Sequence, residues 1–185
     1  MNRLMALSMT ALFAVLAGCS SQNDPASTPD PLPITADAVG HYCAMDLIEH
    51  DGPKGQIFVR GRTDPLWFST IRQTLAYTIM PDSPRGLDAI YVTDMAIVQN
   101  MRQPEPESWM DARQAYYVTE SKLPGGMGGE DPLPFSDRGK AEAFIDEFGG
   151  KILTFDEIPE DYILHYDMFE FNPMSMPDDA TRGQP

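Results

Sequence analysis

The six residues D-P-L-W-F-S at positions 64–69 recur as D-P-L-P-F-S at positions 131–136, an offset of 67 residues. A strand-like run precedes each copy, and a helix-like segment and another strand-like run follow it. These matching flanks favour an internal repeat over a coincidence of two turn signals. We therefore expect an α+β fold of two homologous small ββαβ-type units packed together, because neither unit alone would bury a large core.

A helix is expected after each copy of the motif. Ser69 and Ser136 are the expected N-caps, because a serine hydroxyl can accept a hydrogen bond from a free backbone N–H of the first turn. Gly149 and Gly150 should end the second helix, since glycine readily adopts the left-handed conformation found at helix C-termini. The apolar residues at helical spacing are Phe68, Ile71, Leu75 and Ile79 in the first half, and Ala141, Phe144, Ile145 and Phe148 in the second.

Four strand-like runs flank these helices, and each half also has a candidate for one further strand in front. The four runs are residues 56–59, 89–93, 115–119 and 151–155, and the further candidates are residues 42–48 and 109–113.

The first eighteen residues have the pattern of a bacterial signal peptide. Arg3 precedes an apolar run that ends in L-A-G-C at residues 16–19, which is typical of a lipoprotein cleavage site. An uncleaved membrane anchor is the alternative, but the run is short for a spanning helix. Cleavage would make Cys19 the lipidated first residue of the mature chain. Similarity to bacterial lipoproteins implies that Ser20, in place of a retaining Asp, permits export to the outer membrane, facing the periplasm.

The segments at the two ends of the mature chain lack core-forming side chains. Residues 19–36 contain four prolines among small polar residues, so we expect a flexible linker that holds the folded part away from the membrane. Residues 172–185 are expected to form a flexible tail. The folded units are then expected at residues 37–102 and 107–171, on either side of the proline-rich stretch 103–107.

The composition excludes one large class of function. The chain has 185 residues, of which 13 are Lys or Arg and 28 are Asp or Glu, so its formal net charge is −15. Such an acidic surface repels phosphate groups, and we therefore expect no binding to nucleic acid. The chain also contains 12 methionines, whose thioethers are soft metal ligands.

Cysteine usage points to a soft metal ion. With Cys19 lipidated, Cys43 is the only thiol of the mature chain, and an exported compartment is oxidising. Such a thiol is buried, pairs with another chain or has a chemical role. Met45 lies two residues further on, on the same face as Cys43 if the segment is extended, and the two residues could come closer if it forms a turn. A thiolate and a thioether together suit Cu(I), whereas zinc usually takes four Cys and His ligands and the three histidines here are widely spaced.

The second half carries a glycine-rich insertion, L-P-G-G-M-G-G-E at residues 123–130, where the first half has a short turn. A phosphate-binding loop is excluded, because no Lys followed by Ser or Thr comes after the glycines and the chain is strongly acidic. Two interpretations stay open: a mobile surface loop, or a loop that presents Met127 as a further ligand. A single neutral thioether binds weakly, so the second interpretation requires companion ligands.

Taken together, these stretches resemble the NosL family of copper-delivery lipoproteins. The resemblance covers roughly residues 41–158 and the lipoprotein cleavage site, and its motifs are specific only in combination. The family usually has glycine between the Cys and Met, where this chain has Ala44, a change that should not disturb the ligands. The matching stretches are C-A-M at 43–45, E-H-D-G-P-K-G-Q-I at 49–57, D-M at 94–95, G-G-M-G-G-E at 125–130 and P-F at 134–135.

The resemblance implies Cu(I) binding and delivery to nitrous oxide reductase, in concert with a membrane ABC-type assembly complex. It implies Cys43 and Met45 as ligands and Met127 as the third. Met95 is a less certain candidate, with a core methionine as the alternative, and His41 is a candidate ligand or a donor to one. The expected mechanism is ligand exchange by a membrane-anchored carrier, so we expect no enzymatic activity.

Two other classes of function stay open. Cys43 with His41 or His50 could form the nucleophile–base pair of an enzyme, although no third orienting group with a recognisable signature accompanies them. A lipoprotein that binds another envelope protein would need no metal. Replacing Met45 or Met127 by alanine separates these classes, because it should weaken Cu(I) binding and spare a Cys–His enzyme.

Overall fold

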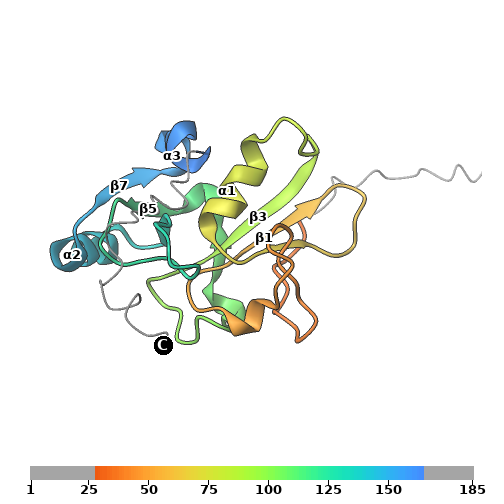
Figure 1. Ribbon diagram of the computed structural model, residues 1–185, viewed down its shortest axis with the longest axis horizontal. Helices are drawn as coiled ribbons and strands as arrows, with labels where there is room; N and C mark the ends of the chain where they lie inside the picture. The colour runs from red at the N-terminus through yellow and green to blue at the C-terminus, as the bar shows by residue number, and fades with distance from the viewer. Residues whose placement is uncertain (1–27, 165–185) are drawn as a thin grey trace, which may run out of the picture.

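The computed structural model describes residues 28–164 and shows a mixed α/β chain with two antiparallel sheets (Figure 1). The expected signal peptide at residues 1–18, the expected lipid attachment at Cys19 and the expected tail at residues 172–185 lie outside the described residues. Within residues 28–164, no helix has both the length and the apolar character needed to cross a bilayer.

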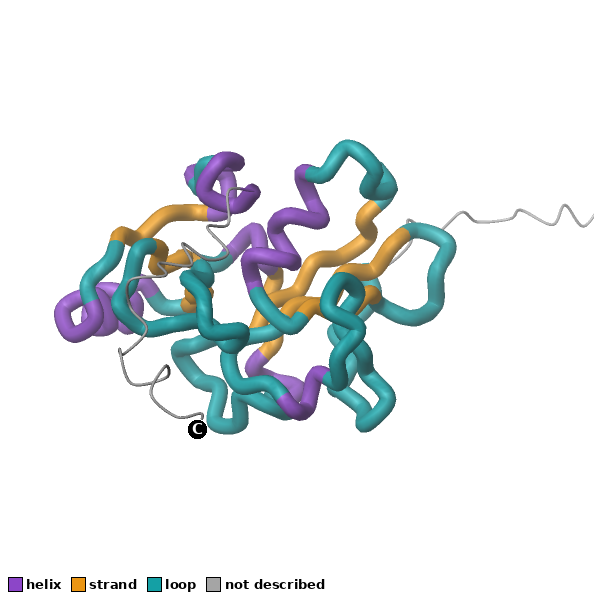
Figure 2. The backbone as a smooth tube through the Cα atoms, viewed as in Figure 1, coloured by secondary structure: helices purple, strands orange, loops and turns teal. Residues whose placement is uncertain are grey.

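The first sheet has four strands in the order β2-β1-β3-β4. β1 (Gly55–Val59) pairs with β2 (Leu66–Phe68) on one side and with β3 (Leu87–Thr93) on the other, and β4 (Trp109–Asp111) pairs with the far side of β3. α1 (Ile71–Ile79) connects β2 to β3 and packs on the sheet (Figure 2).

The second sheet has three strands in the order β6-β5-β7. β5 (Tyr116–Thr119) lies between β6 (Leu133–Phe135) and β7 (Lys151–Thr154). α2 (Arg138–Phe148) connects β6 to β7, and α3 (Glu160–Leu164) packs against α1. In both sheets the chain therefore runs strand, strand, helix, strand, with the first strand in the centre of those three. Four short 3-10 helices complete the described structure: η1 (Leu47–Glu49), η2 (Pro106–Ser108), η3 (Ala112–Gln114) and η4 (Phe155–Glu157).

The main core lies between α1 and the first sheet, and residues of the second half complete it. Tyr117 of β5 is fully buried there, and its hydroxyl donates to the carbonyl oxygen of Ala112 at 2.6 Å. Ile163 of α3 fills the side nearest α1. The buried members of this cluster are Ile57, Val59, Phe68, Ile71, Leu75, Tyr77, Ile90, Val92, Ala112, Ala115, Tyr117 and Ile163.

A buried carboxylate from the other half of the chain anchors the start of each long helix. Asp131 accepts hydrogen bonds from the backbone N–H of Ile71 at 3.1 Å and of Arg72 at 2.7 Å, at the first turn of α1. Asp94, which directly follows β3, accepts from the backbone N–H of Ser136 at 2.9 Å and from its hydroxyl, just before α2. A negative charge is favourable at a helix N-terminus. Because each carboxylate and the helix start that it contacts belong to different halves of the chain, these contacts also hold the two halves together.

The N-caps differ from the sequence expectation by one residue. Thr70 and Asp137 cap α1 and α2, each accepting a hydrogen bond from the backbone N–H three residues further on. The expected caps, Ser69 and Ser136, instead use their hydroxyl groups in side-chain contacts. The expected end of the second helix is confirmed, since Gly149 is its C-cap with a φ of 70°.

The two additional candidate strands have different outcomes. Residues 42–48 form a turn and part of η1 instead of a strand, because backbone hydrogen bonds close this segment on itself. Residues Trp109–Asp111 do form a strand, but it pairs with β3 and so extends the first sheet rather than the second.

The described part of the expected linker is packed against the first sheet. The side-chain amide of Gln56 exchanges two hydrogen bonds with the backbone of Leu32, at 2.9 and 3.1 Å. The hydroxyl of Tyr91 donates to the carbonyl oxygen of Pro29 at 2.8 Å, and Ile34 is 1% exposed. The segment packs here because its backbone supplies the hydrogen-bond partners of the buried Gln56 amide, and because Ile34 is buried in the apolar core.

Candidate metal centre

A hairpin of residues 39–46 carries the first two candidate ligands, Cys43 and Met45. The backbone N–H of Gly40 donates to the carbonyl oxygen of Met45 at 2.9 Å, and that of Ala44 donates to the carbonyl oxygen of Gly40 at 2.8 Å. An isolated antiparallel bridge joins the two arms. The two sulfur-bearing residues therefore belong to one closed turn of backbone, not to an extended segment.

The hairpin is attached to the edge of β2. The backbone N–H of His41 donates to the carbonyl oxygen of Trp67 at 2.7 Å, and Gly40 forms a parallel bridge with Trp67. This attachment places the Sγ atom of Cys43 3.4 Å from the Oγ atom of Ser69, just before α1. The first candidate ligand is thus oriented against the sheet and the start of its helix.

The surroundings of Cys43 restrict its side chain on two sides. A Cβ atom on Gly40 would lie 2.4 Å from Sγ, so the thiol folds back over that glycine. Ser69 donates its hydroxyl hydrogen to the Oε1 atom of Gln73 at 3.2 Å, which leaves its lone pairs free to accept from the thiol. Cys43 is a free, half-buried cysteine. It is therefore held in place while still reachable from solvent.

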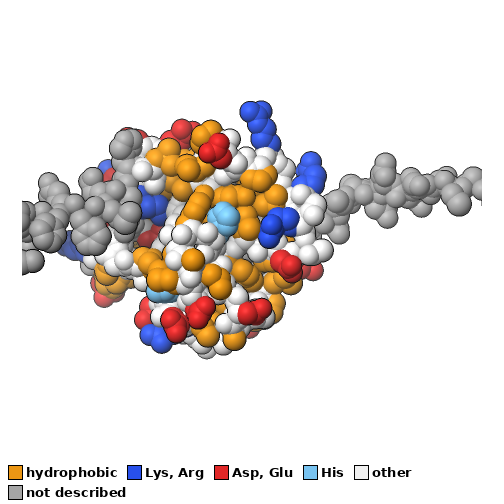
Figure 3. All heavy atoms as spheres, turned by 45° about the vertical axis from the view of Figure 1, so that its right-hand side comes forward, with side chains coloured by type: hydrophobic (Ala, Val, Ile, Leu, Met, Phe, Trp, Pro, Cys, Tyr) orange, Lys and Arg blue, Asp and Glu red, His pale blue; other side chains and the backbone are white. Residues whose placement is uncertain are grey.

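The aromatic rings of the hairpin pack against two buried rings, those of Phe68 in β2 and Tyr77 in α1. The ring of His41 lies with its centroid 4.9 Å from that of Tyr42, 5.7 Å from that of Phe68 and 5.4 Å from that of Tyr77. Burial raises the pKa of both tyrosine hydroxyls, which keeps them uncharged. Tyr42 is nevertheless 45% exposed, and Figure 3 shows apolar side chains gathered on one face of the molecule. His41 is therefore a surface residue within an aromatic cluster beside Cys43.

The glycine-rich loop that carries Met127 is closed by its own backbone. The N–H of Gly125 donates to the carbonyl oxygen of Gly129 at 2.7 Å, and the N–H of Gly128 donates to that of Gly125 at 2.9 Å. Met127 lies at the tip and is 39% exposed. A thioether at the tip of a closed loop is accessible to a metal ion and to a partner.

The base of this loop contacts the turn that follows the Cys43 hairpin and η1. A Cβ atom on Gly126 would lie 1.7 Å from the carbonyl oxygen of Asp51, and one on Gly52 would lie 2.6 Å from the backbone of Gly126. The loop is therefore in direct backbone contact with the segment that begins at His50.

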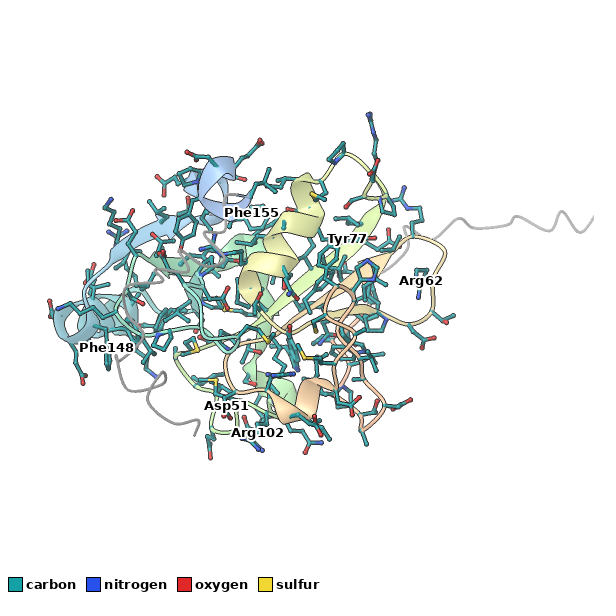
Figure 4. The ribbon with its side chains drawn as sticks, viewed as in Figure 1. Asp51, Arg62, Tyr77, Arg102, Phe148 and Phe155 are labelled. Atoms are coloured by element: carbon teal, nitrogen blue, oxygen red, sulfur yellow. The ribbon has the colours of Figure 1, made fainter. Side chains whose placement is uncertain are left out.

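Lys54 and Arg102 hold that turn from two sides. The Nζ atom of Lys54, whose side chain is fully buried, donates to the carbonyl oxygens of His50 at 2.7 Å and Gly52 at 3.1 Å. Burial lowers the pKa of this ammonium group to about 8. On the outside, Arg102 donates to both carboxylate oxygens of Asp51, at 2.9 and 3.2 Å, and lowers its pKa (Figure 4).

His50 is a candidate donor that the sequence interpretation left outside the ligand set. Its Nε2 atom is buried and has no hydrogen-bond partner in the part of the chain that the structure describes. Buried polar atoms normally have a partner, so an orphaned imidazole nitrogen indicates a ligand or an ordered water. The signal available in the sequence was its place in the E-H-D-G-P-K-G stretch at residues 49–55.

The NosL family model matches residues 31–163, which is most of the chain. The chain belongs to the NosL family. It is 39% identical over 164 residues to the copper-binding lipoprotein NosL of Achromobacter cycloclastes, covering 88% of this chain and 84% of that relative. It is 30% identical over 166 residues to the copper-binding lipoprotein NosL of Stutzerimonas stutzeri, covering 86% of this chain and 85% of that relative.

A solved NosL structure has the same fold. The crystal structure of the copper chaperone NosL from Shewanella denitrificans superposes with a TM-score of 0.64 and 31% sequence identity. The superposition covers 70% of this chain and 95% of that one. The mixed α/β architecture described above is therefore the NosL fold.

The Cys-Ala-Met turn of this NosL chain has an unusual backbone. Ala44 has a φ of 54°, in the left-handed region. A residue with a Cβ atom is disfavoured there by about 1–2 kcal/mol relative to the right-handed region. Glycine lacks this cost, so a glycine at this position would adopt the turn more readily than Ala44 does.

Met95, a further candidate ligand, is partly buried against the core of the second half. Its backbone N–H donates to the carbonyl oxygen of Pro134 at 2.8 Å, just after β3. Its side chain packs against the buried cluster of Val118, Leu133, Phe135 and Ala141. This placement favours the core interpretation of Met95 over a role as ligand.

A site that combined Cys43 with methionines would differ from the usual clusters of His, Cys, Asp and Glu ligands. Among residues 28–164, no group of three or more His, Cys, Asp or Glu side chains is arranged to hold a metal ion. Methionine thioethers are not part of such groups, so a site built on Cys43 with methionines is of a different, softer kind.

Proposed function

We propose that the protein is a lipid-anchored copper chaperone that carries Cu(I) and delivers it for maturation of nitrous oxide reductase. Membership of the NosL family supports this proposal, as do relatives named copper-binding lipoprotein and copper chaperone. The observation that carries it is a free, half-buried Cys43 in a closed hairpin with Met45.

In this proposal Cys43, Met45 and Met127 are the principal ligands. One thiolate with two thioethers is a soft, low-coordinate set that suits Cu(I), whereas Cu(II) prefers imidazole and tetragonal geometry. His41 and His50 are further candidate donors, because the first lies in the same hairpin and the second has an unpartnered nitrogen.

Transfer proceeds by ligand exchange, with no catalytic step. Cu(I) binds the thiolate, so loading releases the Cys43 proton and binding should strengthen as the pH rises. The hydroxyl of Ser69, 3.4 Å from Sγ, can then turn from Gln73 and donate to the thiolate. Low coordination leaves a position open through which an acceptor ligand can enter.

The proposed partners are nitrous oxide reductase and a membrane ABC-type assembly complex. The anchor at Cys19 would hold the protein at a membrane, and an export signal of this kind places it in the periplasm, on the outer membrane in our interpretation. The formal charge of −15 favours docking on a basic surface. The strand-strand-helix-strand order of both sheets supports our inference that the fold derives from two homologous ββαβ units.

Anaerobic Cu(I) titration of the chain without residues 1–19, against a competing chelator, tests the proposal. Tight binding of about one equivalent is expected, and Cys43→Ser and Met127→Leu should each weaken it roughly tenfold or more. Met80→Leu is the matched control, since Met80 is 40% exposed and Met127 is 39% exposed. Wild-type affinity in Cys43→Ser, or no tight binding by the wild type, would overturn the proposal.

A further inference from the structure

A close backbone contact joins the Met127 loop to the turn after the Cys43 hairpin. A Cβ atom on Gly126 would lie 1.7 Å from the carbonyl oxygen of Asp51 and 3.2 Å from the Cα atom of Gly52. A Cβ atom on Gly52 would lie 2.6 Å from both N and Cα of Gly126. Real Cβ atoms do not approach backbone so closely, so this contact requires glycine on both sides.

A buried ionisable side chain lies behind each partner in this contact. Lys54 fixes the turn, because its ammonium group donates to the carbonyl oxygens of His50 and Gly52. Asp131 supports the loop, since a Cβ atom on Gly125 would lie 2.4 Å from its Cβ atom. Both side chains are almost completely buried, at 0% and 3% exposure. The contact is therefore between two supported segments.

Asp131 and Lys54 are each connected to Cys43 through further contacts. Asp131 accepts hydrogen bonds from the first N–H groups of α1, and Ser69, just before that helix, contacts the Cys43 thiol. On the other side, the turn held by Lys54 directly follows η1, which leads out of the hairpin. The tip of the glycine-rich loop is thus located relative to Cys43 through a continuous set of short contacts.

We propose that Gly52, Gly126 and Lys54 are positioning residues that pre-organise Met127 as a ligand of the copper site. This inference rests on the proposed function. A neutral thioether contributes little if a loop must be ordered at the moment of binding, and pre-ordering removes that entropic cost. In this interpretation the glycines around Met127 allow the loop to contact the turn closely, and they are not there to make the loop mobile.

The test is a double-mutant cycle on the Cu(I) affinity of the chain without residues 1–19. Gly126→Ala should weaken binding roughly tenfold, as Met127→Leu does, because supporting residues of metal ligands typically contribute 10- to 100-fold. In the Met127→Leu background, Gly126→Ala should have almost no further effect, since both changes remove the same ligand. Gly139→Ala in α2, where the nearest atom is a side-chain oxygen at 3.2 Å, is the control and should bind as the wild type does.

A spectroscopic measurement separates positioning from general destabilisation. X-ray absorption of the Cu(I) form should show one sulfur neighbour fewer in Gly126→Ala than in the wild type, with thermal unfolding of the metal-free form as the folding check. If Gly126→Ala fails to fold, Lys54→Leu replaces it, because it removes the two hydrogen bonds to the turn, keeps an apolar side chain and adds no sulfur atom.

Two outcomes overturn the inference: unchanged affinity and sulfur count in the positioning variant, or a full further loss when it is added to Met127→Leu. A failed proposed function looks different, because the wild type would then bind no Cu(I) tightly and Cys43→Ser would change nothing.

Discussion

Ionisation of Asp131 should be visible in the stability of the folded chain. Its carboxyl group is 3% exposed at the start of α1. Burial raises its pKa from 3.8 to about 7, and it outweighs the N–H groups of Arg72 and Ile71 and the charges of Arg72 and Lys54, which lower the pKa. In the unfolded chain the same group is fully solvated and should titrate near its ordinary pKa.

The sign and size of the effect follow from these two values. Because the pKa is higher in the folded state, the stabilisation is complete below about pH 4 and is lost as the pH rises through about 7. About three pKa units correspond to about 4 kcal/mol, of which about 2 kcal/mol is lost between pH 5 and pH 7. Lys54 adds no slope in this window, since its pKa of about 8 in the fold lies above it.

Urea unfolding of the wild type and Asp131→Asn across this pH range measures the effect. The wild type should lose about 2 kcal/mol of unfolding free energy from pH 5 to pH 7, whereas the variant should lose almost none. Asp64→Asn is the matched control, because Asp64 holds the same motif position but is exposed, so this variant should keep the wild-type slope. Equal slopes in the wild type and Asp131→Asn would refute the reasoning.

Three further predictions concern the hairpin. Ala44→Gly should raise the melting temperature by roughly 1–3 °C, measured by calorimetry, because it relieves the left-handed φ of 54° and only part of the gain is offset by unfolded-chain entropy; a clear decrease would contradict this. Gly40→Ala should weaken Cu(I) binding roughly tenfold by displacing Sγ of Cys43, whereas Gly139→Ala should leave the affinity unchanged in the same chelator competition. The Cu(I) affinity of the wild type should fall at acidic pH, because protons compete with Cu(I) for the thiolate, and the same pH dependence in Cys43→Ser would exclude Cys43 as a thiolate ligand.

Regular elements could be predicted from sequence because local pattern determines them. The four strand-like runs and the helix expected after each D-P-L-x-F-S copy correspond to observed elements within one or two residues. Strands β2 and β6, which lie inside the two copies, were not predicted, and Phe68, which was assigned to the first helix, belongs to β2. The N-caps at Thr70 and Asp137 could not be chosen over the neighbouring serines. That choice depends on distant partners of the serines, such as Asp94 with Ser136.

The geometry of the candidate site depends on contacts that sequence spacing does not contain. An extended backbone was one expectation for Cys43 and Met45, but hydrogen bonds to Gly40 and a left-handed Ala44 close a hairpin instead. Glycine permits close backbone approach, but nothing in the sequence around residues 125–129 indicates that the partner is the turn at Gly52.

The anchoring of each helix start by a carboxylate from the opposite half has a consequence for any attempt to dissect this chain. A fragment ending near residue 102 would leave the first N–H groups of α1 without Asp131, and it would also lose β4 from its sheet edge. A fragment beginning there would leave Ser136 without Asp94. Although their topologies are similar, each half depends on contacts from the other, and we expect neither half to fold on its own.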